Sequence, residues 1–183
     1  RARIEAVANV QAINILINNS GGPPRGQAST GTTQAFHDAF NQHLIAAQTI
    51  LQAILPGMQG SGYGRIVNVI STSVKEPIRN LGVSNTIRGA VASWSKTLAT
   101  ELGPFGITVN NVLPGYTRTQ RLDQILADRA RATGNSEEKI AESMLATVPL
   151  RRFAEASEIA SVIAFLASPA AGYINGINVP VDG

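Results

Sequence analysis

Four short runs of apolar, largely β-branched residues alternate along this chain with longer segments of helical periodicity. The runs are Ile13–Ile17, Arg65–Ile70, Ile107–Leu113 and Ile177–Val181. Such alternation is typical of βαβ units, in which parallel strands form a sheet with helices on both faces. The first three runs are apolar almost throughout, as expected of strands covered on both sides. The last contains Pro180, which is tolerated chiefly at a sheet edge. The pattern therefore predicts a doubly wound parallel α/β domain with three layers.

Five segments between or after these runs have helical periodicity. They are Thr33–Leu55, Asn85–Leu102, Gln120–Ala132, Ser136–Ala146 and Ala156–Leu166. Thr32 should cap the first helix, and Pro56 with Gly57 should end it. Asn135 and Glu138 have the spacing of a capping box at the start of the fourth helix.

Composition narrows the class of protein. A chain of 183 residues with 44% hydrophobic residues suits one domain, residues 1–183, with a buried core. The net charge is only +3, and the basic residues are scattered along the chain without interleaved aromatic residues. No nucleic-acid partner is therefore expected. No apolar run approaches the roughly 18 residues of a membrane helix, so no membrane partner is expected. Without cysteine there is no thiolate metal site; no metal is expected, and the cytoplasm is the expected location.

The beginning of the chain is unusual for such a sheet. Residues 1–12 resemble the end of a helix that leads directly into the strand Ile13–Ile17. A central apolar strand needs a partner on each side, because otherwise it leaves an open edge. We therefore expect the domain to lack its first strands.

Five short motifs follow one another at characteristic distances. They are Asn18-Asn19-Ser20-Gly21, Arg65-Ile-Val-Asn-Val-Ile-Ser71, Ile107–Thr119 with its Pro114-Gly115 pair, Arg152–Glu155 followed by Ile159-Ala160, and Asn175-Gly176 running on to Gly183. Together they resemble the short-chain dehydrogenase/reductase family over essentially the whole chain. Gly21-Gly-Pro-Pro24 and Val74-Lys-Glu-Pro77 are similar to bacterial 3-oxoacyl-acyl-carrier-protein reductases. The resemblance implies a Rossmann-like domain that binds NAD or NADP, although the Gly-rich turn for the pyrophosphate would lie upstream of Arg1.

The resemblance also implies catalytic roles. Ser71 matches the serine that orients the substrate carbonyl or alcohol. The family's tyrosine and lysine are replaced by Ser84 and Arg88, which lie on one face of a helix. A serine hydroxyl is a poorer acid than a phenol, whereas Arg88 keeps a positive charge that could bind ribose. His43 stands where the family has an asparagine, and a histidine could carry protons at neutral pH.

The same four positions have structural interpretations that the sequence leaves open. Ser71 could cap the loop after its strand, and Ser84 could be the N-cap of a helix that begins at Asn85. Arg88 could form a surface or interface ion pair. His43 could be half-buried and bonded to the backbone.

Further positions follow from the resemblance. The cofactor-binding residues implied are Asn19, Ser20, Gly21, Arg88, Pro114, Gly115, Thr117 and Thr119. The helical segment 120–146 corresponds to the lid over the substrate, and its apolar residues could line a pocket or pack onto the sheet. The family commonly forms homodimers or homotetramers through two long helices, here Thr33–Leu55 and Asn85–Leu102. Four residues of the second helix suit such an interface or the core, namely Ala90, Val91, Trp94 and Leu98.

The resemblance thus implies an NAD(P)-dependent oxidoreductase that acts on a carbonyl or secondary alcohol. His43, Tyr116 or water would supply the proton, although Tyr116 could equally have a packing role. A second hypothesis is a catalytically impaired pseudo-enzyme that binds nucleotide or protein partners. A third is similarity to halohydrin dehalogenases, which carry arginine in the lysine position but retain the tyrosine that Ser84 replaces.

Overall fold

The computed structural model describes residue 6 and residues 12–183, so the predicted helix over residues 1–12 lies almost wholly outside the described residues. The sheet has four strands: β1 (Ile15–Asn18), β2 (Gly64–Val69), β3 (Ile107–Pro114) and β4 (Asn178–Val181). All neighbouring strands are parallel, in the order β1-β2-β3-β4. The predicted parallel sheet is confirmed, with β4 and its Pro180 at an edge.

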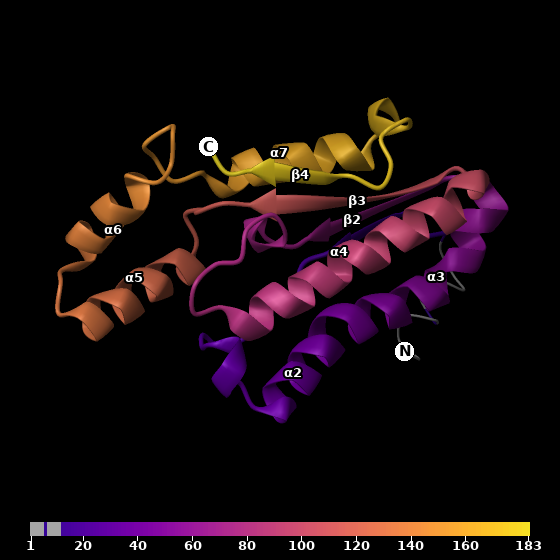
Figure 1. Cartoon of the computed structure of the whole chain (residues 1–183). Coiled ribbons are helices and arrows are strands. Elements are labelled where there is room, and N and C mark those ends of the chain that lie inside the picture. Colours follow the sequence, from indigo (N-terminus) through magenta and orange to yellow (C-terminus); the bar gives the residue numbers. More distant parts are fainter. Residues whose placement is uncertain (1–5, 7–11) are drawn as a thin grey trace.

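Helices cover both faces of this sheet (Figure 1). On one face lie α4 (Gly82–Leu102) and a long helix made of α2 (Thr33–Phe40), the π-helix η2 (Asn41–Ile45) and α3 (Ala46–Ser61). The other face is covered by α7 (Ala156–Ala167). The predicted three-layer α/β/α architecture is therefore confirmed.

Alternate residues of the central strands face opposite layers, as the two-residue period of a strand requires. Ile66 of β2 and Val109 of β3 pack against α3 and α4. Val67 and Val112 pack against α7. All four side chains are at most 1% exposed, which explains why both strands carry apolar residues toward both layers.

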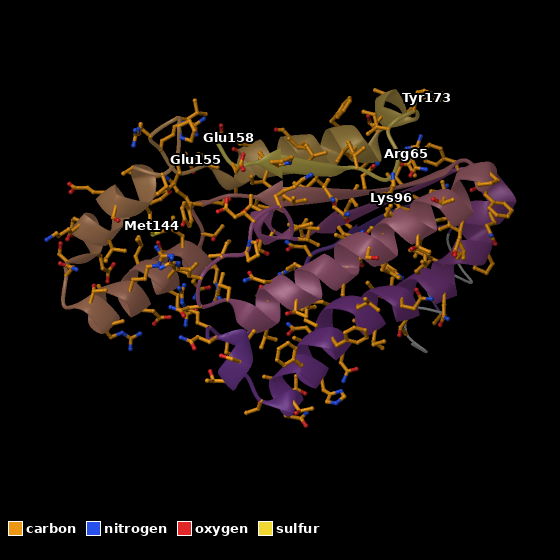
Figure 2. The ribbon with its side chains drawn as sticks, in the orientation of Figure 1. Arg65, Lys96, Met144, Glu155, Glu158 and Tyr173 are labelled. Carbon is orange, nitrogen blue, oxygen red and sulfur yellow. The ribbon has the colours of Figure 1, made fainter. Side chains whose placement is uncertain are left out.

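The connections after the strands form the end of the molecule that matters for ligands. They contain short 3-10 helices, η1 (Ala28–Thr30) and η3 (Thr72–Val74), and the pair α5 (Gln120–Thr133) and α6 (Glu137–Leu145). In Figure 1, α5 and α6 extend beyond the carboxyl end of β3. Figure 2 shows Met144 of α6 at this end and Arg65 of β2 at the opposite end. Two further 3-10 helices, η4 (Gly103–Phe105) and η5 (Pro169–Ala171), follow α4 and α7.

The first long helix does not end at Pro56 and Gly57, contrary to the prediction. It continues to Ser61 with Pro56 inside it, and Gly62 closes it in a left-handed conformation with φ 64°. The last turns carry Met58, which is fully buried in the core with Ile66. Burial of this side chain offsets the hydrogen bond that proline removes. Thr32 caps the helix as predicted, because its hydroxyl accepts a bond from the Ala35 amide at 3.2 Å.

Two predicted helix starts are also wrong. The second long helix begins at Gly82 rather than Asn85, so Ser84 lies inside its first turn and is not its N-cap. The start is fixed by tertiary contact: a Cβ on Gly82 would lie 2.1 Å from the Ala28 nitrogen. The capping box predicted from Asn135 does not form, because Ser136 is the N-cap of α6 and accepts from the Lys139 amide.

The apolar stripes of α5 and α6 do not pack onto the sheet. They meet each other and Phe153 in a separate small core that contains Leu122, Ile140 and Met144. The pair is thus held together largely by its own contacts. Among the residues that the structure describes, no helix has both the length and the apolarity needed to cross a bilayer.

Candidate active site

Ser71 follows the carboxyl end of β2, where the crevice of an open α/β sheet binds ligands. Its extended backbone makes it the N-cap of η3, and its hydroxyl oxygen accepts a hydrogen bond from the Ser73 amide at 3.1 Å. The loop-capping interpretation is therefore realised. The side chain is half-buried, and its hydroxyl hydrogen can still donate to a ligand.

Arg88 is buried beneath this edge of the sheet, with 8% of its surface exposed. The guanidinium donates to the Val69 carbonyl at 3.0 Å and to the Ser20 carbonyl at 3.4 Å. Burial lowers the pKa of Arg88 to about 10, which leaves it charged at neutral pH. Of the two roles that the sequence left open for Arg88, the surface ion pair is wrong, since α4 directs this side chain into the fold and onto two backbone carbonyls.

His43 lies in the π-helix η2 and is 5% exposed. Its Nδ1 lies 2.6 Å from the Ser20 hydroxyl, so it bonds to a side chain and not to the backbone as one interpretation expected. Nε2 is buried and has no hydrogen-bond partner among the described residues. Burial, and next the charge of Arg88, lower the pKa of His43 to about 4. The imidazole is therefore neutral at physiological pH.

Arg88, His43 and Ser20 form one group that is connected by hydrogen bonds. Ser20 links the two others, because its carbonyl accepts from Arg88 and its hydroxyl bonds to His43. Ser84 lies one turn before Arg88 on α4, is half-buried, and makes no side-chain hydrogen bond within the described part of the chain. The structure thus brings the carboxyl ends of β1 and β2, the start of α4 and the π-helix together around a buried cation.

The Pro114-Gly115 turn follows the carboxyl end of β3. Gly115 donates its amide to the Val181 carbonyl at 3.0 Å, and a Cβ there would lie 2.7 Å from the Cα of Asp182. Close packing against the C-terminal segment therefore requires glycine at this position. The Thr117 hydroxyl donates to the Gly115 carbonyl, and the Thr119 hydroxyl donates to the Thr117 carbonyl just before α5.

Tyr116 belongs to the small core of α5 and α6. Its ring meets Phe153 edge to face, with the centroids 6.2 Å apart. This contact gives it a packing role.

The remaining cofactor-side residues implied by the sequence lie after β1. Asn19 and Gly21 are exposed, and a Cβ on Gly21 would find only the Gln42 side chain, at 3.8 Å. Gly21 is not in the left-handed region of backbone space. The structure therefore does not demand glycine here for its own packing.

Sequence reasoning missed a ladder of asparagine side chains across the sheet. Asn18, Asn68, Asn111 and Asn178 are direct partners in the register of the four strands. Each amide nitrogen donates to the next amide oxygen, at 2.8, 3.1 and 2.8 Å. The presence of an asparagine in each of the four strands was the available signal. The ladder fixes the register from which Ser71, Gly115 and the Asn19 turn emerge.

Of the four residues of the second long helix that could serve an interface or the core, the structure gives three a role within this chain. Val91 and Leu98 are 4% and 8% exposed and lie in the core of this chain, so they cannot face a second copy. The Trp94 indole donates to Gln48 at 2.9 Å, within the same layer.

The site contains donors suited to the nicotinamide end of a dinucleotide. Arg88 uses two bonds of a guanidinium that has five N–H groups, and the buried Nε2 of His43 and Oγ of Ser73 have no partner in residues 12–183. These groups and the turn at residues 114–119 fit a ribose and a carboxamide. In the same described part of the chain, no three His, Asp or Glu side chains gather into a group able to hold a metal ion.

The whole chain, residues 1–183, matches the family described as enoyl-(acyl carrier protein) reductase. It is 33% identical over 174 residues to the 3-oxoacyl-[acyl-carrier-protein] reductase FabG of Vibrio harveyi, covering 94% of this chain and 66% of the relative. It is 29% identical over 171 residues to the NADPH-dependent reductase BacG of Bacillus subtilis, covering 93% and 66%. The chain thus spans about two thirds of the length of these curated relatives.

A solved structure gives the same result for the fold. YwfH, described as an NADPH-dependent reductase involved in bacilysin biosynthesis, superposes with a TM-score of 0.93 at 27% identity, over 100% of this chain and 70% of the other. One assignment follows from these matches. It agrees with the parallel sheet, the serine after β2 and the buried cation on α4. This chain belongs to the short-chain dehydrogenase/reductase family.

Proposed function

We propose that this protein is an NAD(P)-dependent oxidoreductase that reduces a carbonyl, or oxidises the corresponding secondary alcohol, in the manner of 3-oxoacyl reductases. The observation that carries the proposal is the buried charge of Arg88, held at the carboxyl edge of the sheet beside the Ser71 loop. A desolvated cation that has no carboxylate partner within residues 12–183 suits an electron-rich ligand. The relatives described as NADPH-dependent reductases support the same reaction class.

Arg88 would hold the nicotinamide ribose with its remaining N–H groups, and Asn19, Ser20, Gly21, Pro114, Gly115, Thr117 and Thr119 would border the bound dinucleotide. When bound, the reduced nicotinamide supplies a hydride to the carbonyl carbon. Ser71 would donate its hydroxyl hydrogen to the carbonyl oxygen and hold the reacting carbon in place.

The proton for the carbonyl oxygen needs a source other than a tyrosine. An imidazole with a pKa of about 4 is almost entirely neutral at pH 7, so very little of His43 is present in the protonated form that could act as an acid. A neutral imidazole can still accept a proton at one nitrogen and release one from the other. We propose that the Ser20–His43 pair relays a proton from water, and that Tyr116 and Ser84 do not supply it.

The test uses the full-length protein. NADH and NADPH binding would be measured first, followed by oxidation of the bound cofactor with S-(3-oxobutanoyl)-N-acetylcysteamine, a neutral 3-oxoacyl thioester. Ser71→Ala should lower kcat by about 100-fold. Thr72→Val, which removes the neighbouring hydroxyl, should leave kcat unchanged. Turnover that survives Ser71→Ala would reject Ser71 as the orienting residue.

One observation favours the second candidate, a pseudo-enzyme that binds nucleotide or partners. Ser71 already caps η3 and Arg88 already binds two backbone carbonyls, so both have structural duties. Nucleotide binding without turnover over a broad panel of carbonyl compounds would support this function instead.

A restoration variant separates the two candidates more sharply. Ser84→Tyr with Arg88→Lys returns the tyrosine and lysine of the family to adjacent turns of α4. If the scaffold is redox-competent and limited by its proton donor, kcat should rise by at least about tenfold. A double variant that folds and binds NADPH but gains no turnover would favour the pseudo-enzyme.

We also propose that the protein forms a homodimer or homotetramer through the layer that contains α2, η2 and α4. Phe40 and Ile45 support this arrangement, since both are apolar and are 40% and 43% exposed on that layer. The cytoplasm is the proposed location, supported by a sequence without cysteine.

A further inference from the structure

A cavity of about 610 Å³ lies between the α5–α6 pair and the loops that follow β1 and β2. Its polar lining consists mainly of Arg25, Arg79, Asn80, Arg129, Thr133 and Ser143. The volume is that of a small-molecule site. Because all three walls follow the carboxyl ends of strands, the cavity lies on the same side of the sheet as Ser71.

The charge of this cavity is strongly one-sided. Arg25, Arg79 and Arg129 form no ion pair with a carboxylate anywhere in residues 12–183. The single acidic side chain of the lining, Asp128, is paired with Arg131 of the same helix. Three guanidinium groups thus meet around one space, and none of them is in ion-pair contact with a carboxylate of the described residues.

The protein holds these cations at a cost. Arg25 is partly buried, and its pKa is lowered by burial, then by the charges of Arg129 and Arg121, with Asp128 opposing them only in part. Like charges brought together in this way repel, and a bound anion would relieve the repulsion. Arginine is also the side chain best shaped to grip a carboxylate or phosphate, because its planar fork can make two parallel bonds.

The two loops that carry Arg25 and Arg79 are joined before any ligand binds. Gly26 donates its amide to the Asn80 carbonyl at 2.9 Å, and Gly82 donates to the Gly26 carbonyl at 2.9 Å. Asn80, on the cavity wall, has φ 59°, a left-handed conformation uncommon for residues other than glycine. Backbone held in this way fixes the spacing of the arginines and reduces the ordering cost of binding.

We propose that this arginine cavity binds the anionic end of the substrate, so that the protein prefers small carbonyl compounds that carry a carboxylate or phosphate. This inference depends on the proposed oxidoreductase function for the position of the carbonyl, which would lie at Ser71 while the anion extends under α5 and α6. Arg79 follows Ser71 within the same connection, and Arg25 follows Ser20, so the catalytic edge and the cavity share their loops. The α5–α6 pair would then recognise the substrate as well as cover it.

The test measures binding directly, without cofactor. The full-length protein would be titrated at low ionic strength with 4-oxopentanoate and with its methyl ester, which has the same carbon chain but a neutral methyl ester group in place of the charged carboxylate. The acid should bind at least about tenfold more tightly than the ester. Inorganic phosphate should compete with the acid if the cavity recognises anions generally, and should fail to compete if it recognises carboxylates alone.

Two variants with a matched control locate the effect. Arg25→Gln with Arg129→Gln should lower the affinity for the acid to that for the ester and leave the ester unaffected. Lys139→Gln removes one positive charge at an exposed position of α6 outside the cavity lining, and should change neither. Ser143→Glu places a carboxylate on an exposed part of the wall and should also suppress binding of the acid. It keeps the test decisive if the double variant unfolds.

The outcomes separate this inference from the proposed function. Equal binding of acid and ester, or acid affinity that survives the double variant, overturns the anion site even if the neutral thioester is reduced. Acid binding that depends on the arginines upholds the site even if no carbonyl compound is turned over.

Discussion

Strand β2 has a buried arginine at each end: Arg65 at its start, and Arg88 of α4 beside the carbonyl of its last residue. Arg65 donates to three backbone carbonyls, at 2.8, 3.2 and 3.3 Å, and lies 4.3 Å from the centre of the Tyr63 ring. In the described part of the chain, Arg88 has two carbonyl partners and no aromatic one, and burial lowers its pKa. The fold thus gives Arg65 more partners than Arg88, and the burial of Arg88 costs folding free energy.

The two ends of the sheet also differ in the number of buried polar atoms that lack a hydrogen-bond partner. Four buried side-chain polar atoms have no partner among the described residues. Three of them, in His43, Ser73 and Asn85, belong to elements at the carboxyl end of the sheet, whereas Thr108 lies near the start of β3. Unsatisfied polar atoms cost stability unless a ligand pairs with them. The difference indicates that one end of the sheet is built for rigidity and the other for binding.

The largest difference in stability between the two ends of the sheet should appear when a glycine at each end is replaced. Gly106, just before β3, has φ 72°, and a Cβ there would lie 2.2 Å from the Gly62 carbonyl oxygen. Gly106→Ala should therefore reduce the free energy of unfolding by about 3–4 kcal/mol. Gly21→Ala, at the open end, should change it by less than about 0.5 kcal/mol. Urea unfolding followed by the fluorescence of Trp94 measures both, and similar losses would contradict the comparison.

The two arginines can be compared directly. Arg65→Met should cost about 3 kcal/mol, since it removes the donor to three carbonyls and the contact with Tyr63, and should leave NADPH affinity unchanged. Arg88→Met should cost about 1 kcal/mol or less, because it also removes a desolvated charge. It should weaken NADPH binding by about tenfold or more. Reversed stability losses, or unchanged NADPH affinity in the Arg88 variant, would show that the two ends do not differ in this way.

The buried histidine predicts a pH dependence. The pKa of His43 is about 4 in the folded state and near 6.5 in an unfolded chain. The unfolded state therefore takes up the proton first as pH falls, so stability should be full above about pH 6.5 and decline towards pH 4. The loss should be about 2 kcal/mol in unfolding experiments across this range. His43→Asn should show a smaller decline, and an equal decline would assign the effect to other groups.

The smallest effect concerns the sheet that joins the two ends. Asn178→Ala removes the last amide of the asparagine ladder and leaves the Asn111 amide nitrogen without its partner at 2.8 Å. The expected cost is about 1 kcal/mol of folding free energy. Cofactor affinity should be unchanged, because β3 separates the edge strand β4 from β2, to which Arg88 is bonded. Denaturant midpoints and an NADPH titration test both parts. A large loss of NADPH affinity would mean that the edge strand contributes to the site.

Much of the fold could be predicted because strand periodicity depends on local sequence. All four strands were placed within two residues of their observed bounds, and their parallel direction followed from the alternation of strands and helices. Helix ends were less predictable, since Pro56 is retained by the burial of Met58 and the start at Gly82 by contact with Ala28. These contacts join residues that are distant in the sequence, so local patterns could not reveal them.

The candidate site shows the same division. Ser71 and Arg88 could be located from motif spacing, but their partners could not. The bond between Ser20 and His43 connects residues 23 positions apart and depends on a π-helix. The arginine cavity depends on three connections that meet only in the folded chain. Its residues are scattered single arginines in the sequence, without a motif to mark them.

The π-helix at Asn41–Ile45 has a consequence for changes in chain length. A π-turn contains about one residue more than an α-turn, and each residue advances an α-helix by roughly 100°. Five residues of π-helix therefore turn the chain about as far as four residues of α-helix. Deleting one residue within 41–45 should relax this turn into ordinary α-helix and leave Thr33–Phe40 facing the same way relative to Ala46–Ser61. A deletion elsewhere in this long helix removes a residue that no bulge has absorbed, so it should rotate one part of the helix against the other by roughly 100°. A single-codon deletion should therefore be tolerated best within the π-turn.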